Sequence, residues 1–148
     1  MNTVNSGTVI NLQICPEKGS PLTSIEQAEF ISGHGIVGDA HSGKLENRQV
    51  LLMDSETQEA FEIGPDITRE NLTTKNLDLS TLNRGDILTL GTSVKLEVTG
   101  DCEPCRNLDS KRPGLSREIK GKRGILCRVI GPGFVKVNDE IACEAKQL

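Results

Sequence analysis

The sequence predicts a mostly-β domain, a sandwich or a barrel. Short apolar runs recur at close spacing, and turns rich in glycine separate them, as in all-β folds. No long helical pattern alternates with the strands, which argues against a Rossmann-like parallel sheet. A chain of 148 residues can bury one core, so we expect a single domain over residues 1–148.

The first half of the chain is expected to form three strands and a short helix. Apolar and polar residues alternate from Thr8 to Cys15, which indicates a half-buried strand. Ser55, with Gln58 three residues later, forms a capping-box pattern that begins a helix. A loop over 33–43 holds four glycines, whose backbone can approach a ligand closely. The predicted elements here are strands over 8–15, 24–31 and 49–53 and a helix over 55–62.

The second half contains the clearest hairpin of the sequence. Gly91-Thr92-Ser93 separates two short apolar runs, a pattern typical of two antiparallel strands. Glycine closes the last short helix, as is common at helix C-termini. The predicted elements here are strands over 67–74, 87–90, 94–99 and 124–130, helical turns over 77–82 and 115–120, and a closing phrase over 136–143 that resembles the hairpin.

Composition narrows the possible partners. The chain has no Trp, no Tyr and a net charge of −4, so aromatic stacking on nucleic acid and binding to its phosphates are both disfavoured. No apolar run approaches the roughly 20 residues of a membrane span. The first residues do not show the basic stretch followed by an apolar stretch that is typical of a secretory signal peptide. We therefore expect a cytoplasmic protein. Basic residues crowd 111–123, either as a solvated surface or as an anion site.

Five cysteines in a chain without a visible signal peptide argue against a disulfide framework. Three of them lie in alternating apolar stretches and are expected to pack as small hydrophobic residues: Cys15, Cys127 and Cys143. The other two form Cys102-Glu103-Pro104-Cys105, directly after a predicted strand.

This pair has three chemical interpretations. The alternative to all three is that both residues are inert loop cysteines. A thioredoxin-type dithiol needs a long helix after the pair, and Pro113 leaves space for barely two turns. A structural zinc site needs four ligands, and only one close pair is present. A reactive thiolate that carries sulfur or binds a soft metal needs only one cysteine. The adjacent Arg106 would favour its charged form.

Several phrases together resemble the MOSC domain family, the C-terminal domains of molybdenum cofactor sulfurases. Gly35-Ile36-Val37-Gly38-Asp39-Ala40-His41 is similar to the family's glycine-rich signature ending in Asp-x-His. The further phrases follow in the family's order: Arg48-Gln49-Val50-Leu51-Leu52, Arg69-Glu70-Asn71-Leu72, Leu82-Asn83-Arg84-Gly85-Asp86, the strand ending in Pro104-Cys105, and Val135-Lys136-Val137-Asn138-Asp139, with Asn for the usual Gly. The resemblance spans about residues 9–141.

The resemblance implies a closed, strongly bent β-barrel of MOSC type with a few short helices. It also implies a molybdenum–molybdopterin cofactor and a cysteine that carries persulfide sulfur or ligates molybdenum, which corresponds to Cys105. Cys102 is then a resolving thiol or merely a neighbour. The chain lacks the pyridoxal-phosphate domain of the large sulfurases, so that cofactor is not expected. In this it resembles the stand-alone bacterial members.

A phosphate-bearing cofactor needs anion donors beside a thiolate. The loop around Gly38 could supply backbone N–H groups, and Asp39 could cap a turn or orient His41 through a hydrogen bond. His41 could bind an anion or donate a proton near pH 7. The expected cofactor-binding set is His41, Arg48, Asn71, Asp39, Gly38 and Arg106, with Glu70 fixing the loops and Arg112, Lys120 and Arg123 as weaker anion-site candidates.

Two functions of different classes remain open. A carrier would hold molybdenum cofactor or persulfide sulfur on Cys105 and exchange it with partner enzymes. An enzyme would use molybdenum bound through Cys105 to reduce N-hydroxylated compounds, with electrons from a separate donor, since the chain has no flavin, haem or iron–sulfur motif. A structural β domain without a cofactor is the third option.

Overall fold

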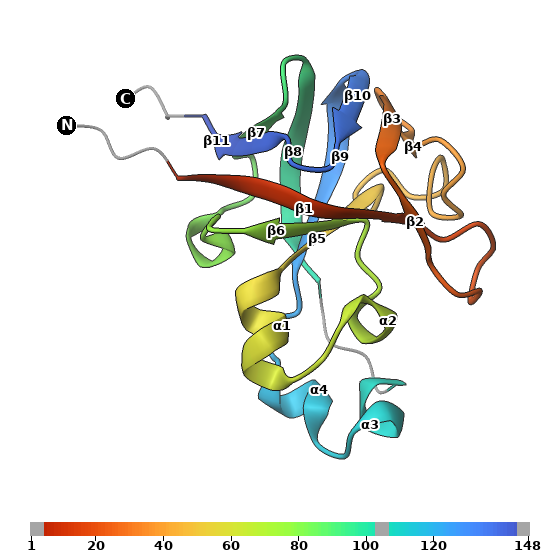
Figure 1. Ribbon diagram of the computed structural model, residues 1–148, viewed down its shortest axis with the longest axis vertical. Coiled ribbons are helices and arrows are strands. Elements are labelled where there is room, and N and C mark those ends of the chain that lie inside the picture. Colours follow the sequence, from red (N-terminus) through yellow and green to blue (C-terminus); the bar gives the residue numbers. More distant parts are fainter. Residues whose placement is uncertain (1–4, 103–106, 145–148) are drawn as a thin grey trace.

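The structure, a computed structural model, describes residues 5–102 and 107–144. Seven strands form a closed barrel (Figure 1). Their bounds are β1 (Ser6–Ile14), β5 (Val50–Asp54), β6 (Leu72–Lys75), β7 (Ile87–Leu90), β8 (Val94–Asp101), β9 (Ile125–Gly131) and β11 (Glu140–Cys143). The fold class predicted from the sequence is therefore confirmed.

The strands follow the order β11-β7-β8-β9-β5-β6-β1 around the barrel, and pairing of β1 with β11 closes it. All of these neighbours are antiparallel except β5 and β6, which run parallel and are connected through α1 (Ser55–Phe61) and α2 (Pro65–Thr68). A short strand, β2 (Thr23–Ile25), extends the sheet beside the far end of β1. Closure leaves few unpaired edge groups in the barrel.

Strand β1 changes partner along its length. Its first residues pair with β11, its middle residues with β6 and its last residues with β2, and the pairing with β6 has a register shift between Val9 and Asn11. Gly7 lies at this seam, where a Cβ atom would stand only 2.2 Å from the carbonyl oxygen of Lys75. The close approach of three strands at Gly7 thus requires a residue without a side chain.

A second sheet of three short strands lies beside the barrel: β10 (Gly133–Lys136), β3 (Gln27–Ile31) and β4 (Gly35–Ile36). In Figure 1 this sheet stands at the upper right. It presents Phe30 and Val135 to the main core, where both are fully buried. The glycine-rich loop that contains Asp39 and His41 leaves from β4, so this small sheet fixes where that loop begins.

The short helices gather at one end of the barrel (Figure 1). Beside α1 and α2 they include α3 (Asn107–Lys111) and α4 (Leu115–Glu118), while a 3₁₀ turn, η1 (Leu79–Thr81), precedes β7. A second apolar cluster of Met53, Leu108, Leu115 and Ile119 joins α3 and α4 to β5. No helix among the described residues is long and apolar enough to span a membrane.

Most predicted elements are present, and three differ in detail. Asp54, rather than Ser55, caps α1, because its carboxylate accepts the N–H of Thr57 at 3.0 Å. The strand expected over 67–74 was wrong before Leu72: Ile67 and Thr68 belong to α2, and β6 begins only at Leu72. Pro65 at the helix start favours this helical turn. The single strand expected over 24–31 is divided into β2 and β3 at Glu26.

Gly7→Ala tests the seam of the barrel. The new methyl group would overlap the Lys75 carbonyl, so we expect the free energy of unfolding to fall by about 1–3 kcal/mol. Urea denaturation followed by circular dichroism measures this. Gly64→Ala is the matched control, because Gly64 has an ordinary φ of −127° and its nearest obstacle is a mobile carboxylate. Equal stability losses in the two variants would contradict the proposed constraint.

Candidate functional site

A pocket of about 600 Å³ opens between the barrel and the α3 region. Several segments that are distant in sequence contribute to it, from the turn after β1 to the start of β9. Its lining residues are Lys18, Gly19, His41, Arg48, Leu51, Asp66, Ile67, Arg69, Asn71, Cys102, Leu108, Ser110, Lys111, Arg123 and Leu126. The size falls within the ~300–1,000 Å³ typical of small-molecule pockets.

Three of the residues expected to bind a cofactor meet in this pocket: His41, Arg48 and Asn71. Cys102, the first cysteine of the pair, lines it as well and is buried. Cys105 and Arg106 lie outside the described residues. In the glycine-rich loop, only His41 lines the pocket. Gly38 is exposed outside the pocket, and Asp39 is buried behind His41.

Asp39 is the centre of a buried polar cluster behind His41. One carboxylate oxygen accepts the N–H of Cys15 at 2.8 Å and the side-chain amide of Asn71 at 3.1 Å. The other accepts the N–H of His41 at 3.1 Å and lies 3.3 Å from its Nδ1 atom. Ala40 returns an N–H to the Cys15 carbonyl at 2.7 Å. The loop is thereby fixed to the end of β1, and the contact expected between Asp39 and His41 is present.

These contacts decide the charge of Asp39. Burial raises the pKa of its carboxyl, but hydrogen bonds from the His41 side chain and from the N–H groups of Cys15 and His41 outweigh burial. The pKa therefore lies below its ordinary value of 3.8, and Asp39 is a carboxylate at neutral pH. A carboxylate at Nδ1 leaves Nε2 as the imidazole atom available to a guest. The His41 side chain is 56% exposed at the pocket.

Asn71 joins three parts of the barrel at the floor of the pocket. Its side-chain oxygen accepts the N–H of Leu51 at 3.0 Å, and its amide donates to Gln13 at 3.2 Å as well as to Asp39. Its own N–H donates to the Leu51 carbonyl at 2.9 Å. Asn71 is buried and its bonds are used within the fold, so it positions β1, β5 and the loop rather than offering a free amide.

Glu70, immediately before Asn71, is fully buried beneath α2. Its carboxylate accepts three side-chain hydrogen bonds: from Thr68 at 2.5 Å, Thr73 at 2.5 Å and Gln58 at 2.6 Å. A buried carboxylate is tolerated when donors surround it in this way. Glu70 therefore holds the segment that carries Arg69 and Asn71 against α1 and α2, as the expected loop-fixing role requires.

Arg69 is a lining residue that the sequence motif contained but did not single out. It ends α2 in a left-handed conformation, with φ of 61°. Its guanidinium donates to the carbonyl of Ser20 at 2.6 Å and to the sulfur of Cys15 at 3.3 Å. Arg69 thus ties the turn after β1 to the pocket wall. The nearest signal in the sequence was the Arg-Glu-Asn phrase itself.

The basic run over 111–123 separates into residues that line the pocket and residues that do not. Arg117, Lys120 and Lys122 are exposed outside this pocket. Arg112 bonds the carbonyl of Phe61 and so connects α3 to α1. Only the two ends of the run reach the pocket, namely Lys111 and Arg123. With Lys18, Arg48 and Arg69, the described lining has five Lys or Arg side chains against one carboxylate, Asp66.

The other described cysteines are distributed as expected for packing residues. Cys127 lies in β9 with no exposed surface, and burial raises the pKa of its thiol far above the ordinary value, which makes a thiolate unfavourable. Cys15 is buried at the end of β1, and Cys143 is half-buried in β11. None of these three lines the pocket that contains Cys102.

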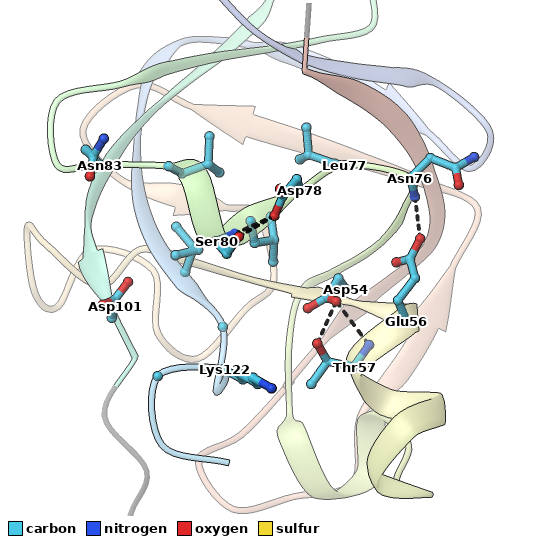
Figure 2. A pocket seen from close by; sticks show the side chains of 15 residues that line it. Asp54, Glu56, Thr57, Asn76, Leu77, Asp78, Ser80, Asn83, Asp101 and Lys122 are labelled. Carbon is cyan, nitrogen blue, oxygen red and sulfur yellow. Dashed lines mark hydrogen bonds between the residues drawn. The ribbon is translucent and has the colours of Figure 1, made fainter.

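A different pocket of about 560 Å³ lies between α1, η1 and the start of β9 (Figure 2). It is acidic, but three of its carboxylates already serve the fold. Asp54 caps α1, Asp78 caps η1 and Glu56 accepts the N–H of Asn76 at 2.7 Å. None of the expected cofactor-binding residues lines it. Over the described part of the chain, no group of three or more His, Cys, Asp or Glu residues could hold a metal ion.

Comparison with known protein families identifies the family of this chain. The sequence model of the MOSC domain family matches residues 41–142, more than half of the chain. The chain belongs to the MOSC domain family. MOSC domains are associated with molybdenum cofactor binding and sulfur handling, and generally function with molybdenum cofactor enzymes. The match covers His41, Arg48 and Asn71 as well as the segment with both cysteines. No curated protein sequence matches the chain significantly.

Solved structures support the MOSC fold. The YuaD protein from Bacillus subtilis superposes with a TM-score of 0.83 at 22% identity, covering 99% of this chain and 100% of that one. YiiM from Geobacillus stearothermophilus gives a TM-score of 0.70 at 19% identity, covering 94% and 75%. YiiM from Escherichia coli gives 0.67 at 19%, covering 99% and 72%. At these identities the likeness concerns the fold alone.

Asp39→Asn tests the cluster behind His41. The amide would face the His41 N–H groups with its own donors, so we expect a loss of about 1–3 kcal/mol in the free energy of unfolding at pH 7. The depressed pKa of Asp39 stabilises the fold above about pH 4, and this contribution is lost as the pH falls through the folded-state pKa.

The stability difference between wild type and Asp39→Asn should therefore narrow at about pH 3. Urea midpoints at both pH values measure the effect. A difference that stays constant between the two would show that the charge of Asp39 contributes nothing.

Proposed function

We propose that this MOSC domain is a molybdenum cofactor-binding or sulfur-carrier module that uses Cys105 as its thiolate or persulfide group. The observation that carries the proposal is the single pocket in which His41, Arg48 and Asn71 meet Cys102. Cys105 follows Cys102 by three residues and precedes Leu108, another lining residue, by three. The described residues that flank Cys105 in the sequence, Cys102 and Leu108, therefore both line this pocket.

The donors of the pocket suit a phosphate-bearing guest that also needs one sulfur ligand. Arg48, Lys111 and Arg123 offer cationic N–H groups, which bind phosphate by charge-assisted hydrogen bonds. Thiolate sulfur is a ligand for soft transition metals. Four of the described pocket-lining residues are large and aliphatic and could pack against a ring: Leu51, Ile67, Leu108 and Leu126. The volume of about 600 Å³ is sufficient for a cofactor-sized molecule.

In this proposal Cys105 supplies the sulfur ligand and the arginines hold the phosphate. When bound, the cofactor would supply a metal centre for transfer of sulfur or electrons. His41 keeps Nδ1 directed to the Asp39 carboxylate and presents Nε2 to the guest, where it can form a hydrogen bond. Asn71 and Glu70 hold the strands that carry these groups.

Cys105→Ala is the decisive variant. Purified protein should be assayed for molybdenum by elemental analysis and for sulfane sulfur by cyanide release. We expect whichever signal wild type carries to fall to background in Cys105→Ala, because the thiolate is the attachment point. Cys143→Ala, which removes a half-buried thiol outside the pocket, should keep the wild-type signal.

The pattern of the two signals separates the roles. Molybdenum that disappears with Cys105 favours cofactor ligation, and sulfane sulfur without metal favours the carrier. Turnover of an N-hydroxylated base with an added reductase would identify the reductase alternative. Wild-type protein that retains neither signal after reconstitution with cofactor and with a persulfide donor would contradict the proposal and leave a structural domain.

A further inference from the structure

Arg123 is a buried cation whose charge is not matched within the described fold. Only 8% of its surface is exposed, and it is the one Lys or Arg side chain in the described ranges that is buried. Its Nε and Nη1 atoms are inaccessible to solvent and have no hydrogen-bond partner. None of the ion pairs found among the described residues includes it.

Such an arrangement is unfavourable for a protein by itself. Arginine cannot relieve the burial by losing its proton, because a guanidinium stays protonated in proteins. A buried charge without a partner carries a large desolvation penalty, and removing the charge or pairing it is favourable. Unsatisfied buried polar groups are rare in native proteins, and each requires an explanation such as a functional role or a bound water or ion. The missing acceptor is therefore expected from a molecule that enters the pocket.

The backbone holds Arg123 rigidly at the pocket wall. On one side, the Lys122 N–H donates to the Ile119 carbonyl at 2.8 Å. On the other, Gly124 has φ of +121°, its carbonyl accepts the N–H of Cys102 at 2.9 Å, and a Cβ there would stand 2.5 Å from the Leu52 carbonyl. The backbone on both sides of Arg123 is thus held by hydrogen bonds, one of which joins Gly124 to Cys102.

The rest of the lining determines the charge of the missing partner. Lys18, Arg48 and Lys111 are exposed basic residues that line the same pocket, and Asp66 is the one carboxylate among the described lining residues. A cationic wall around a buried guanidinium disfavours cations and favours an oxyanion. Guanidinium groups match phosphate oxygens in geometry as well as in charge.

We infer that Arg123 is the anion receptor of this pocket and binds the phosphate group of a phosphomonoester guest. The inference rests on the proposed function in that it concerns the same pocket and guest. It goes further in one respect: the phosphate is bound by a residue that acts independently of Cys105 and of any metal or sulfur that Cys105 carries. Protein without metal or bound sulfur should therefore already bind inorganic phosphate.

The test uses the full chain without metal, with inorganic phosphate as the probe. Binding is measured by isothermal titration calorimetry and by the phosphate-dependent rise in Tm. In Arg123→Met, which keeps the length of the side chain but removes its charge, we expect affinity to fall by at least about tenfold. Arg117→Met, at an exposed arginine of α4 outside the pocket, should bind as wild type does.

Stability without phosphate gives a second readout that a structural arginine would not produce. Because Arg123 is unpaired, Arg123→Met should have a Tm equal to or higher than that of wild type in phosphate-free buffer. Arg123→Lys keeps the charge and covers the case in which the methionine variant fails to fold; it should retain weakened binding. Wild-type affinity in Arg123→Met, or a lowered Tm together with unchanged binding in Arg123→Lys, would overturn the inference.

Cys105→Ala distinguishes this inference from the proposed function. Phosphate binding unchanged in Cys105→Ala supports an independent receptor, and its loss contradicts one. Sulfur or molybdenum loading of Cys105 in wild type tests the proposed function by itself. The two can fail separately, because loading without phosphate binding overturns only the role of Arg123, and phosphate binding without loading overturns only the role of Cys105.

Discussion

The carboxylate of Asp39 is the interaction on which the pocket most depends. It accepts hydrogen bonds from the end of β1, from the glycine-rich loop and from Asn71. These segments are distant in sequence, and each would leave a buried donor unsatisfied without Asp39. Because several donors converge on one anion, its charge is maintained despite burial. The orientation of His41 then follows from the same contact.

The barrel explains why such a cluster can exist in this small protein. The strands β1, β5 and β6 lie side by side, and their ends bring Cys15, Leu51 and Asn71 together. The parallel pairing of β5 and β6 requires a connection over the end of the barrel, which α1 and α2 provide. That connection carries Glu70 and Arg69, so the exception in the sheet topology also builds one wall of the pocket.

The buried polar side chains around the pocket differ in whether their hydrogen-bonding groups have partners. Asp39, Glu70 and Asn71 are buried and amply hydrogen-bonded, which is how folds retain polar side chains for rigidity. Arg123 is buried with two nitrogens unpaired. A rigid, satisfied cluster on one side of the pocket and an unsatisfied cation on another is the arrangement expected of a preorganised binding site. Stability and binding place opposite demands on Arg123.

The sequence by itself determined the mostly-β class, the hairpin, most strand positions and the motif that ends in Asp39 and His41. These features are local: alternation, turn glycines and short phrases operate over a few residues. It also offered two roles for Asp39, capping a turn or orienting His41 through a hydrogen bond. The sequence did not predict the cap at Asp54 or the true start of the strand expected over 67–74. These boundaries depend on single residues, namely on which of two neighbouring side chains caps the helix and on the helical turn that begins at Pro65.

Only the tertiary structure decided which residues share the pocket. Lys18, Arg69 and Arg123 come together because β1, β6 and β9 meet around a closed barrel, and strand closure is a long-range property that no local pattern contains. In the sequence, Arg123 is one member of a basic run that also suits a solvated surface. Its burial depends on the packing of α4 and β9 against β5, so its unpaired charge could be recognised only once the fold was known.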